Sequence, residues 1–178
     1  MDDILATGIG ELDAALGTGG LPLGSLVEVH GLSVADLTAF VSLLLQRIGR
    51  GRGRLLPMAF ETRPTPPFAD VGEALARGAT VVALLAADGA AEAWMQSPAT
   101  AQTLHSMAAT SRGVILCALP LTVHVQSQLE PPSLGLSEAA ALRLTVEHAP
   151  MATGTGYRMR VVKSKMADPF REAAFARA

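Results

Sequence analysis

The segment Gly31–Thr38 is the part of the chain whose position best suits it to bind a phosphate group. It follows the first strand expected in the core, and nucleotides bind parallel sheets at such a loop. A phosphate-binding loop reads Gly-x-x-x-x-Gly-Lys-Ser/Thr: its backbone N–H groups surround the phosphates, its lysine neutralises their charge and its hydroxyl binds magnesium. Here Gly31 and Thr38 fit that pattern, but Asp36 replaces the second glycine and Leu37 replaces the lysine.

Both replacements work against phosphoryl transfer. Asp36 places a negative charge where the phosphates would lie, and it suits the positive end of a helix instead. Leu37 can only pack, and loss of the lysine removes the main charge stabilisation of the transferred group. We therefore expect a chain that is not an ATPase and holds no cofactor, with Thr38 an ordinary helix residue.

The remaining reactive side chains form no recognisable catalytic site. The single cysteine, Cys117, lies in an apolar run without a Ser/His/Asp partner pattern, so we expect a structural thiol in a reducing compartment. Trp94 is expected to pack, and the arginines between positions 47 and 54 complement a helix C-terminus, with a phosphate contact as the alternative. We expect no metal site, because no metal-ligand spacing connects the histidines His30, His105, His124 and His148.

Apolar patterning predicts an α/β fold. Continuous apolar runs over Thr80–Ala86 and Val114–Leu119 are typical of parallel strands buried on both faces. Alternation over Leu142–His148 and Tyr157–Ser164 predicts an antiparallel hairpin near the C-terminus. The other predicted elements are strands over Ser25–His30 and Leu55–Phe60 and helices over Gly8–Leu16, Asp36–Gly49, Phe68–Arg77 and 90–111, the last broken at Pro98. The order of all these strands and helices predicts a mostly parallel sheet flanked by helices.

Composition limits the class of protein. The 178 residues suit one globular domain, and 49% of them are hydrophobic, which excludes a disordered chain. No apolar run is long enough to span a bilayer, and the N-terminus carries acids where a signal peptide carries bases, so we expect a cytoplasmic protein. The net charge of -2 argues against a dedicated nucleic-acid binder, so we expect weak or indirect binding of DNA.

Two stretches of the sequence resemble the RecA/RadA recombinase family. The first runs from Ala6-Thr7-Gly8 to Val27-Glu28-Val29-His30-Gly31 and carries the Thr-Gly, Leu-Asp, Gly-Gly-Leu-Pro and Val-Glu-hydrophobic-x-Gly elements with which RecA-like cores open. The second, 161–175, is similar to a stretch near the end of the bacterial RecA core. The resemblance implies a single truncated RecA-like domain over residues 1–178, without the N-terminal polymerisation helix and C-terminal domain of RecA.

The resemblance also implies where the other ATPase residues would lie, and most of them are altered. Glu61 occupies the place of the glutamate that activates water, as a relic or as a solvated acid at a strand end. The magnesium-supporting acid is missing, because Asp88 comes too late in the sequence, and Ala118-Leu119-Pro120 replaces a polar sensor. The DNA-contacting loop corresponds to Thr122–Ser137, which has no lysine or arginine with which to hold a single strand.

Lys163 and Lys165 are the family residues that remain. In RecA filaments the matching lysines reach across the protomer interface to ATP bound by the neighbour. With Phe170 they are therefore candidates for an interface, and the alternative is that they project into solvent from an exposed strand face.

A short RecA relative with an altered phosphate loop is similar to the ImuA (SulA-like) proteins of bacterial mutagenesis cassettes. This resemblance implies a non-catalytic accessory protein of DNA repair and the SOS response, a pseudo-ATPase that binds RecA or the subunits of a translesion polymerase. Two alternatives remain open at this point. One is a degenerate nucleotide-binding ATPase with a cation supplied by Arg63 or Lys165, and the other is a DNA-binding RecA paralogue.

Overall fold

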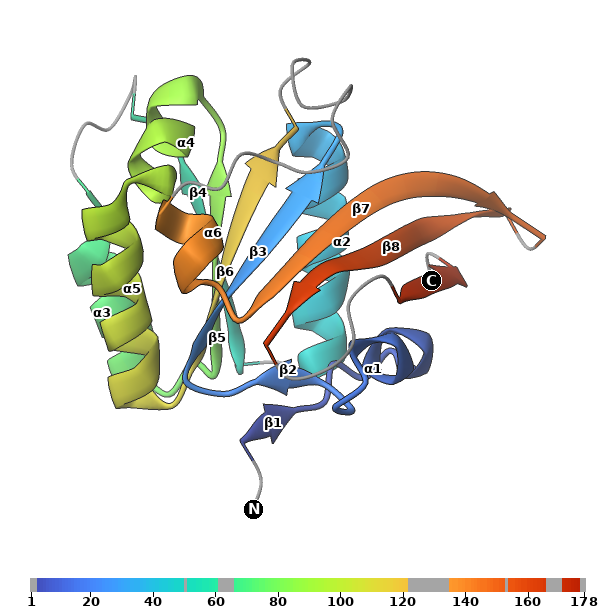
Figure 1. Cartoon of the computed structure of the whole chain (residues 1–178), viewed down its shortest axis with the longest axis horizontal. Coiled ribbons are helices and arrows are strands. Elements are labelled where there is room, and N and C mark those ends of the chain that lie inside the picture. The colour runs from blue at the N-terminus through green and yellow to red at the C-terminus, as the bar shows by residue number, and fades with distance from the viewer. Residues whose placement is uncertain are drawn as a thin grey trace.

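The computed structural model describes residues 3–49, 51–60, 66–121, 135–152, 154–165 and 171–176. Within these residues seven strands form one sheet in the order β4-β5-β6-β3-β7-β8-β9 (Figure 1). A separate antiparallel pair, β1 and β2, lies near the N-terminus. The strands are β1 (Ile4–Leu5), β2 (Leu21–Pro22), β3 (Ser25–Gly31), β4 (Gly53–Met58), β5 (Val81–Ala86), β6 (Val114–Pro120), β7 (Leu142–Met151), β8 (Gly154–Ser164) and β9 (Glu172–Ala176).

The large sheet is mostly parallel, and the predicted α/β architecture is confirmed. The neighbours from β4 to β7 run parallel, with β3 between β6 and β7. β8 turns back against β7 to form the predicted hairpin. A third antiparallel strand, β9, pairs with the Gly156–Arg160 part of β8 and was not predicted.

Helices cover both faces of the sheet. The buried side chains of α1 (Gly10–Leu16) and α2 (Val34–Ile48) form one core with Val27 and Val29 of β3. The opposite core contains Leu26 of β3, and its helices are α3 (Phe68–Ala76), α4 (Gly89–Gln96), α5 (Pro98–Ser111) and α6 (Gly135–Ala139). No helix in the described part of the chain is long and apolar enough to cross a membrane.

Local side-chain chemistry explains where the helices begin. α4 and α5 are separated as predicted, because Ser97 accepts the N–H of Thr100 and Pro98 starts the new helix. α2 begins at Val34, two residues before the predicted start at Asp36, because Ser33 caps it. The short helix α6 was not predicted, and it begins inside the segment Thr122–Ser137 that was expected to be a loop.

The Thr7-Gly8 pair forms a tight turn and does not belong to the first helix. α1 begins at Gly10, and the hydroxyl of Thr7 accepts the N–H of Ile9 at 3.2 Å. Gly8 has a φ of +76°, and a Cβ added to it would lie 2.9 Å from the carbonyl oxygen of Arg47. The turn therefore brings the chain against the C-terminal end of α2, where only glycine fits.

Gly8→Ala should lower the free energy of unfolding by about 1–3 kcal/mol, because it combines a left-handed backbone with a clash against main-chain atoms. Urea denaturation would measure the change. Gly10→Ala is the matched control, since a Cβ at this helical position meets no atom within 4 Å and should not destabilise the protein. Equal stability of the Gly8 variant and the wild type would contradict the assigned turn.

Candidate functional site

The connection between β3 and α2 is a helix cap. Leu32 and Ser33 are the residues between the last residue of β3 and the first of α2. The Ser33 hydroxyl accepts the backbone N–H of Asp36 at 3.1 Å and donates to the carboxylate of Asp36 at 2.8 Å. The hydroxyl is therefore an N-cap that is also held by the Asp36 side chain, and it occupies a backbone N–H that a phosphate loop would direct at its ligand.

The side chains at the lysine and hydroxyl positions of the motif are committed to the fold. Leu37 is 1% exposed, and its side chain fills the space beside Gly31, where an added Cβ would lie 2.9 Å from Leu37 Cγ. Thr38 donates its hydroxyl to the carbonyl oxygen of Val34 at 2.7 Å. The residues present at this edge do not fit the phosphates and magnesium of a bound nucleotide.

Some of the other positions that the family resemblance singled out lie at this edge of the sheet. Asp88 follows β5 and accepts the N–H of Ala91 at 2.7 Å, so it caps α4. Pro120 ends β6 beside Gly31 in the parallel register. Glu61 and Phe170 lie outside the described residues, as do residues 122–134 of the expected DNA loop.

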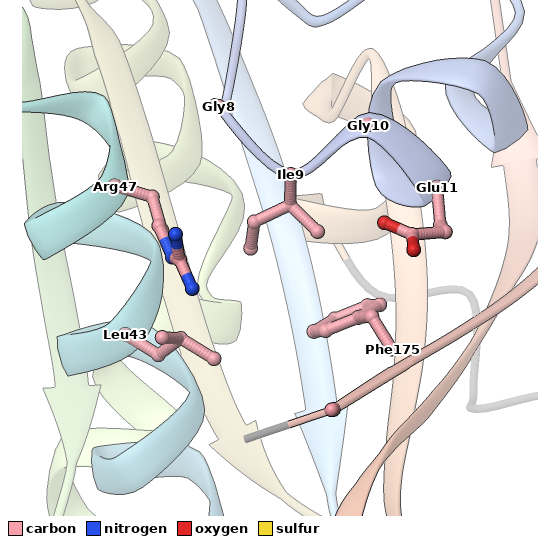
Figure 2. A pocket seen from close by; sticks show the side chains of 8 residues that line it. Gly8, Ile9, Gly10, Glu11, Leu43, Arg47 and Phe175 are labelled. Atoms are coloured by element: carbon pink, nitrogen blue, oxygen red, sulfur yellow. The ribbon is translucent and has the colours of Figure 1, made fainter. Parts of the chain in front are cut away.

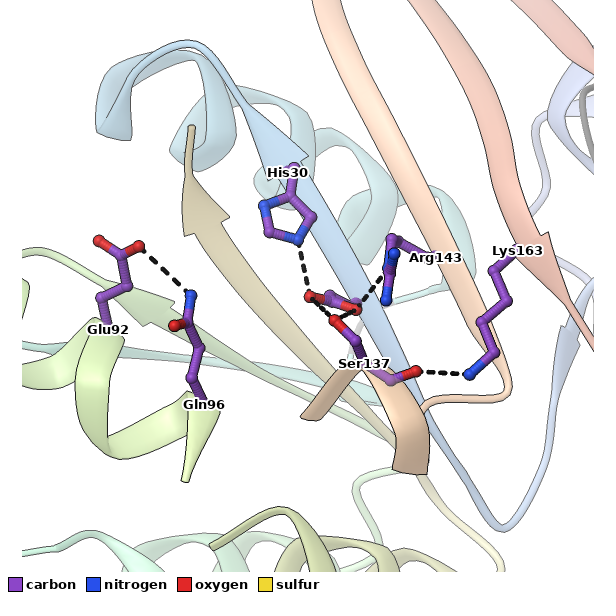
Figure 3. Close-up of polar contacts among 7 residues, drawn as sticks. His30, Glu92, Gln96, Ser137, Arg143 and Lys163 are labelled. Carbon is purple, nitrogen blue, oxygen red and sulfur yellow. Dashed lines mark hydrogen bonds and ion pairs between the residues drawn. The ribbon is translucent and has the colours of Figure 1, made fainter. Parts of the chain in front are cut away.

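A buried polar cluster that was not predicted lies within the sheet. Cys117 of β6, Glu28 of β3, Arg143 of β7 and Lys163 of β8 are aligned in register across four neighbouring strands. Glu28 is the centre of the cluster and is 2% exposed. Its partners His30, Ser137 and Arg143 are labelled in Figure 3. Its carboxylate accepts from Arg143 Nε at 2.9 Å, lies 2.7 Å from His30 Nε2 and accepts from the Ser137 hydroxyl at 3.0 Å.

The charges of the cluster set the protonation state of its members. Burial by itself would raise the pKa of Glu28, but the hydrogen bond and charge of His30 and the Arg143 guanidinium outweigh it, and the pKa lies below the ordinary 4.5. Burial and the nearby Glu28 charge raise the pKa of the Cys117 thiol far above its ordinary range. A thiol that stays protonated is a poor nucleophile, so the geometry agrees with a structural cysteine.

A signal for this cluster was present in the sequence. Glu28 stands inside a strand whose neighbours Val27 and Val29 are apolar, and Arg143 has the same setting between two leucines. Charged residues in buried strands need partners of opposite charge. The partner of Glu28 could not be read from the sequence, because it depends on which strands are neighbours and on their register.

The two lysines retained from the family pattern lie against α6. Lys163 Nζ donates to the carbonyl oxygen of Ser137 at 2.5 Å and to that of Glu138 at 3.4 Å. Lys165 Nζ donates to the carbonyl oxygen of Ala139 at 3.4 Å. The lysines therefore satisfy the C-terminal carbonyls of this helix, a role that was in neither of the two alternatives considered for them.

Metal binding finds no support within the described residues, where no group of three or more His, Cys, Asp or Glu side chains could hold an ion. Trp94 of α4 contacts Phe60, which follows β4, and Phe68 of α3 at ring-centroid distances of 5.4 and 5.2 Å, so it packs as expected.

The parallel sheet with β3 at its centre, the helices on both faces and the antiparallel C-terminal strands define a RecA-like fold. A solved structure with this fold, the crystal structure of the RadB recombinase, superposes with a TM-score of 0.65 over 97% of this chain and 95% of that chain, at 16% sequence identity. No protein-family model matches the sequence, and no curated protein matches it either. The structural likeness at this identity shows the fold alone.

Proposed function

We propose that this protein is a non-catalytic RecA-like accessory protein of bacterial DNA repair and SOS mutagenesis, which acts by binding RecA or a translesion polymerase complex. The observation that carries the proposal is the β3–α2 connection, where a RecA-like fold has a capped helix and a buried Leu37 at the position of the phosphate cradle. A RecA-like surface without a nucleotide site of its own suits a protein that binds to an assembly but does not hydrolyse ATP in it.

The proposed contact with RecA uses the face that carries Lys163 and Lys165. In the free chain these lysines are hydrogen-bonded to the end of α6. Phosphate oxygens are stronger acceptors for an ammonium group than neutral carbonyls, because the hydrogen bond is then between charged groups. The lysines would exchange the α6 carbonyls for the nucleotide of a neighbouring RecA protomer, so this protein would cap a filament or recruit another protein to its end.

ATP hydrolysis by RecA from the same organism on single-stranded DNA tests the proposal. Added in substoichiometric amounts, this protein should change the hydrolysis rate, because it acts at filament ends. No change up to an excess would exclude RecA as the direct target and leave the polymerase complex as the partner. Tight binding of ATP or ADP by the isolated protein would contradict its non-catalytic role.

The double variant Lys163→Ala/Lys165→Ala should weaken binding to RecA filaments at least about tenfold, because truncating one side of a buried charged contact is costly. Binding can be measured by fluorescence anisotropy of filaments on labelled DNA. Arg158→Ala is the matched control, since Arg158 is an exposed cation of the same strand that pairs with Glu147.

The lysines also stabilise α6, so the thermal unfolding of each variant must be compared with that of the wild type. Lys163→Arg/Lys165→Arg keeps the charges and should retain binding. Unchanged binding by a folded double alanine variant would rule out this docking geometry.

A further inference from the structure

A pocket of about 260 Å³ lies between the start of α1, the last turns of α2 and the end of β9 (Figure 2). It is on the α1 and α2 side of the sheet, away from both the β3–α2 connection and the lysines of β8. Its described lining has an apolar floor and two charged walls, which Figure 2 shows on opposite sides. The lining residues are Gly8, Ile9, Gly10, Glu11, Leu43, Arg47, Phe175 and Ala176.

The floor of the pocket is apolar and firmly supported. Phe175 contacts Phe40 and Tyr157 at ring-centroid distances of 6.3 and 6.0 Å, and it is 4% exposed. Ile9 and Leu43 belong to the same core cluster. Because these side chains are held by the core, the floor is preformed and a bound group would not have to order it.

The two walls carry charges of opposite sign, and neither has a partner among the described residues. Arg47 is in the last turn of α2, Glu11 is in the first turn of α1, and both are exposed. No hydrogen bond or ion pair of either side chain occurs in the described part of the chain. Arg112 and Arg160 differ from Arg47 in this respect, since they pair with Asp3 at 2.5 Å and with Glu172 at 2.6 Å. The pocket therefore presents an anion-binding and a cation-binding group on either side of an apolar seat.

This combination selects one chemical class of ligand. A nucleotide or another polyanion is disfavoured because Glu11 would repel it. The volume is also below the 300–1,000 Å³ typical of sites for drug-sized molecules and cofactors. One apolar side chain of a peptide fits the volume, and flanking residues of opposite charge fit the walls.

We propose that this pocket binds a peptide segment of a partner protein. A medium-sized apolar side chain such as leucine lies on Ile9, Leu43 and Phe175, an acidic residue on one side of it pairs with Arg47, and a basic residue on the other side pairs with Glu11. The proposal does not depend on RecA being the partner, because it uses a different surface from the lysines.

The test is a titration of the full-length ¹⁵N-labelled protein with two capped tripeptides, acetyl-Lys-Leu-Asp-amide and acetyl-Asp-Leu-Lys-amide, which present the charges in both orders. We expect one of them to shift the backbone amides of Gly8, Gly10 and Ala176 in a saturable manner, with a Kd of about 1 mM. Acetyl-Lys-Gly-Asp-amide has the same charges without the apolar side chain and should bind at least about fivefold more weakly.

Two variants distinguish specific binding in this pocket from weak nonspecific binding at the surface. Arg47→Gln and Glu11→Gln should each weaken binding about threefold to fivefold, whereas Arg158→Gln, which lies elsewhere on the surface, should leave it unchanged. The inference is overturned if neither peptide shifts these amides at up to about 10 mM. It is equally overturned if the glycine peptide binds as well as the better leucine peptide, or if binding survives in both pocket variants.

Discussion

Replacing Glu28 with alanine is expected to lower the free energy of unfolding by about 3–5 kcal/mol, because it breaks a buried ion pair on one side only. The Arg143 side chain is almost fully buried, and Glu28 is its partner at 2.9 Å. Without that carboxylate the guanidinium is left charged in the protein interior, and the hydroxyl of Ser137 loses its hydrogen bond to Glu28. Urea denaturation followed by circular dichroism would measure the change.

Glu147→Ala is the control for this experiment. Glu147 pairs with Arg158 at 3.1 Å on the surface, where both side chains are about half exposed, so its loss should cost less than about 1 kcal/mol. If the two substitutions lower the free energy of unfolding by the same small amount, the buried ion pair does not stabilise the fold as its geometry implies.

The free energy of unfolding of the wild type should depend on pH in the acid range because of the same cluster. Since the pKa of Glu28 is lowered in the folded protein, its stabilisation is present above pH 4.5 and is lost as the pH falls through the lower folded pKa. In Glu28→Gln this part of the dependence of stability on pH should disappear.

Leu37→Lys should destabilise the protein by about 3 kcal/mol or more, although it restores the lysine of a phosphate-loop motif. The position is 1% exposed and packs against Gly31, so the variant loses apolar burial and places an ammonium group in the core. Ala35→Lys is the matched control, since Ala35 is exposed in the same turn of α2 and the change should stay within about 0.5 kcal/mol.

Nucleotide binding should not return even in the double variant Asp36→Gly/Leu37→Lys. Ser33 still starts α2 at Val34, and the short connection leaves no backbone loop to surround phosphates. Isothermal titration with ATP and magnesium would test this. Micromolar binding by the double variant would show that the segment can open into a cradle and that only the lysine was missing.

The amino-acid sequence determined the layers of the fold. The apolar runs that became β5 and β6, the alternation of β7 and β8 and the amphipathic α2 are local patterns, and local patterns specify which faces must be buried. The start of α2 was also readable, because Ser33 and Asp36 have the spacing of a capping box. The predicted start at Asp36 lies two residues after the observed start at Val34.

The tertiary structure alone decided which side chains meet. Glu28 is 109 residues from Ser137 and 115 from Arg143 along the chain, and it meets them because β7 lies beside β3 in one register and α6 covers that face. The same is true of the lysines of β8 at the end of α6, and of Glu11, Arg47 and Phe175 around one pocket. Strand order and register arise from the packing of the whole chain, so a sequence pattern that identifies each strand does not reveal its neighbours.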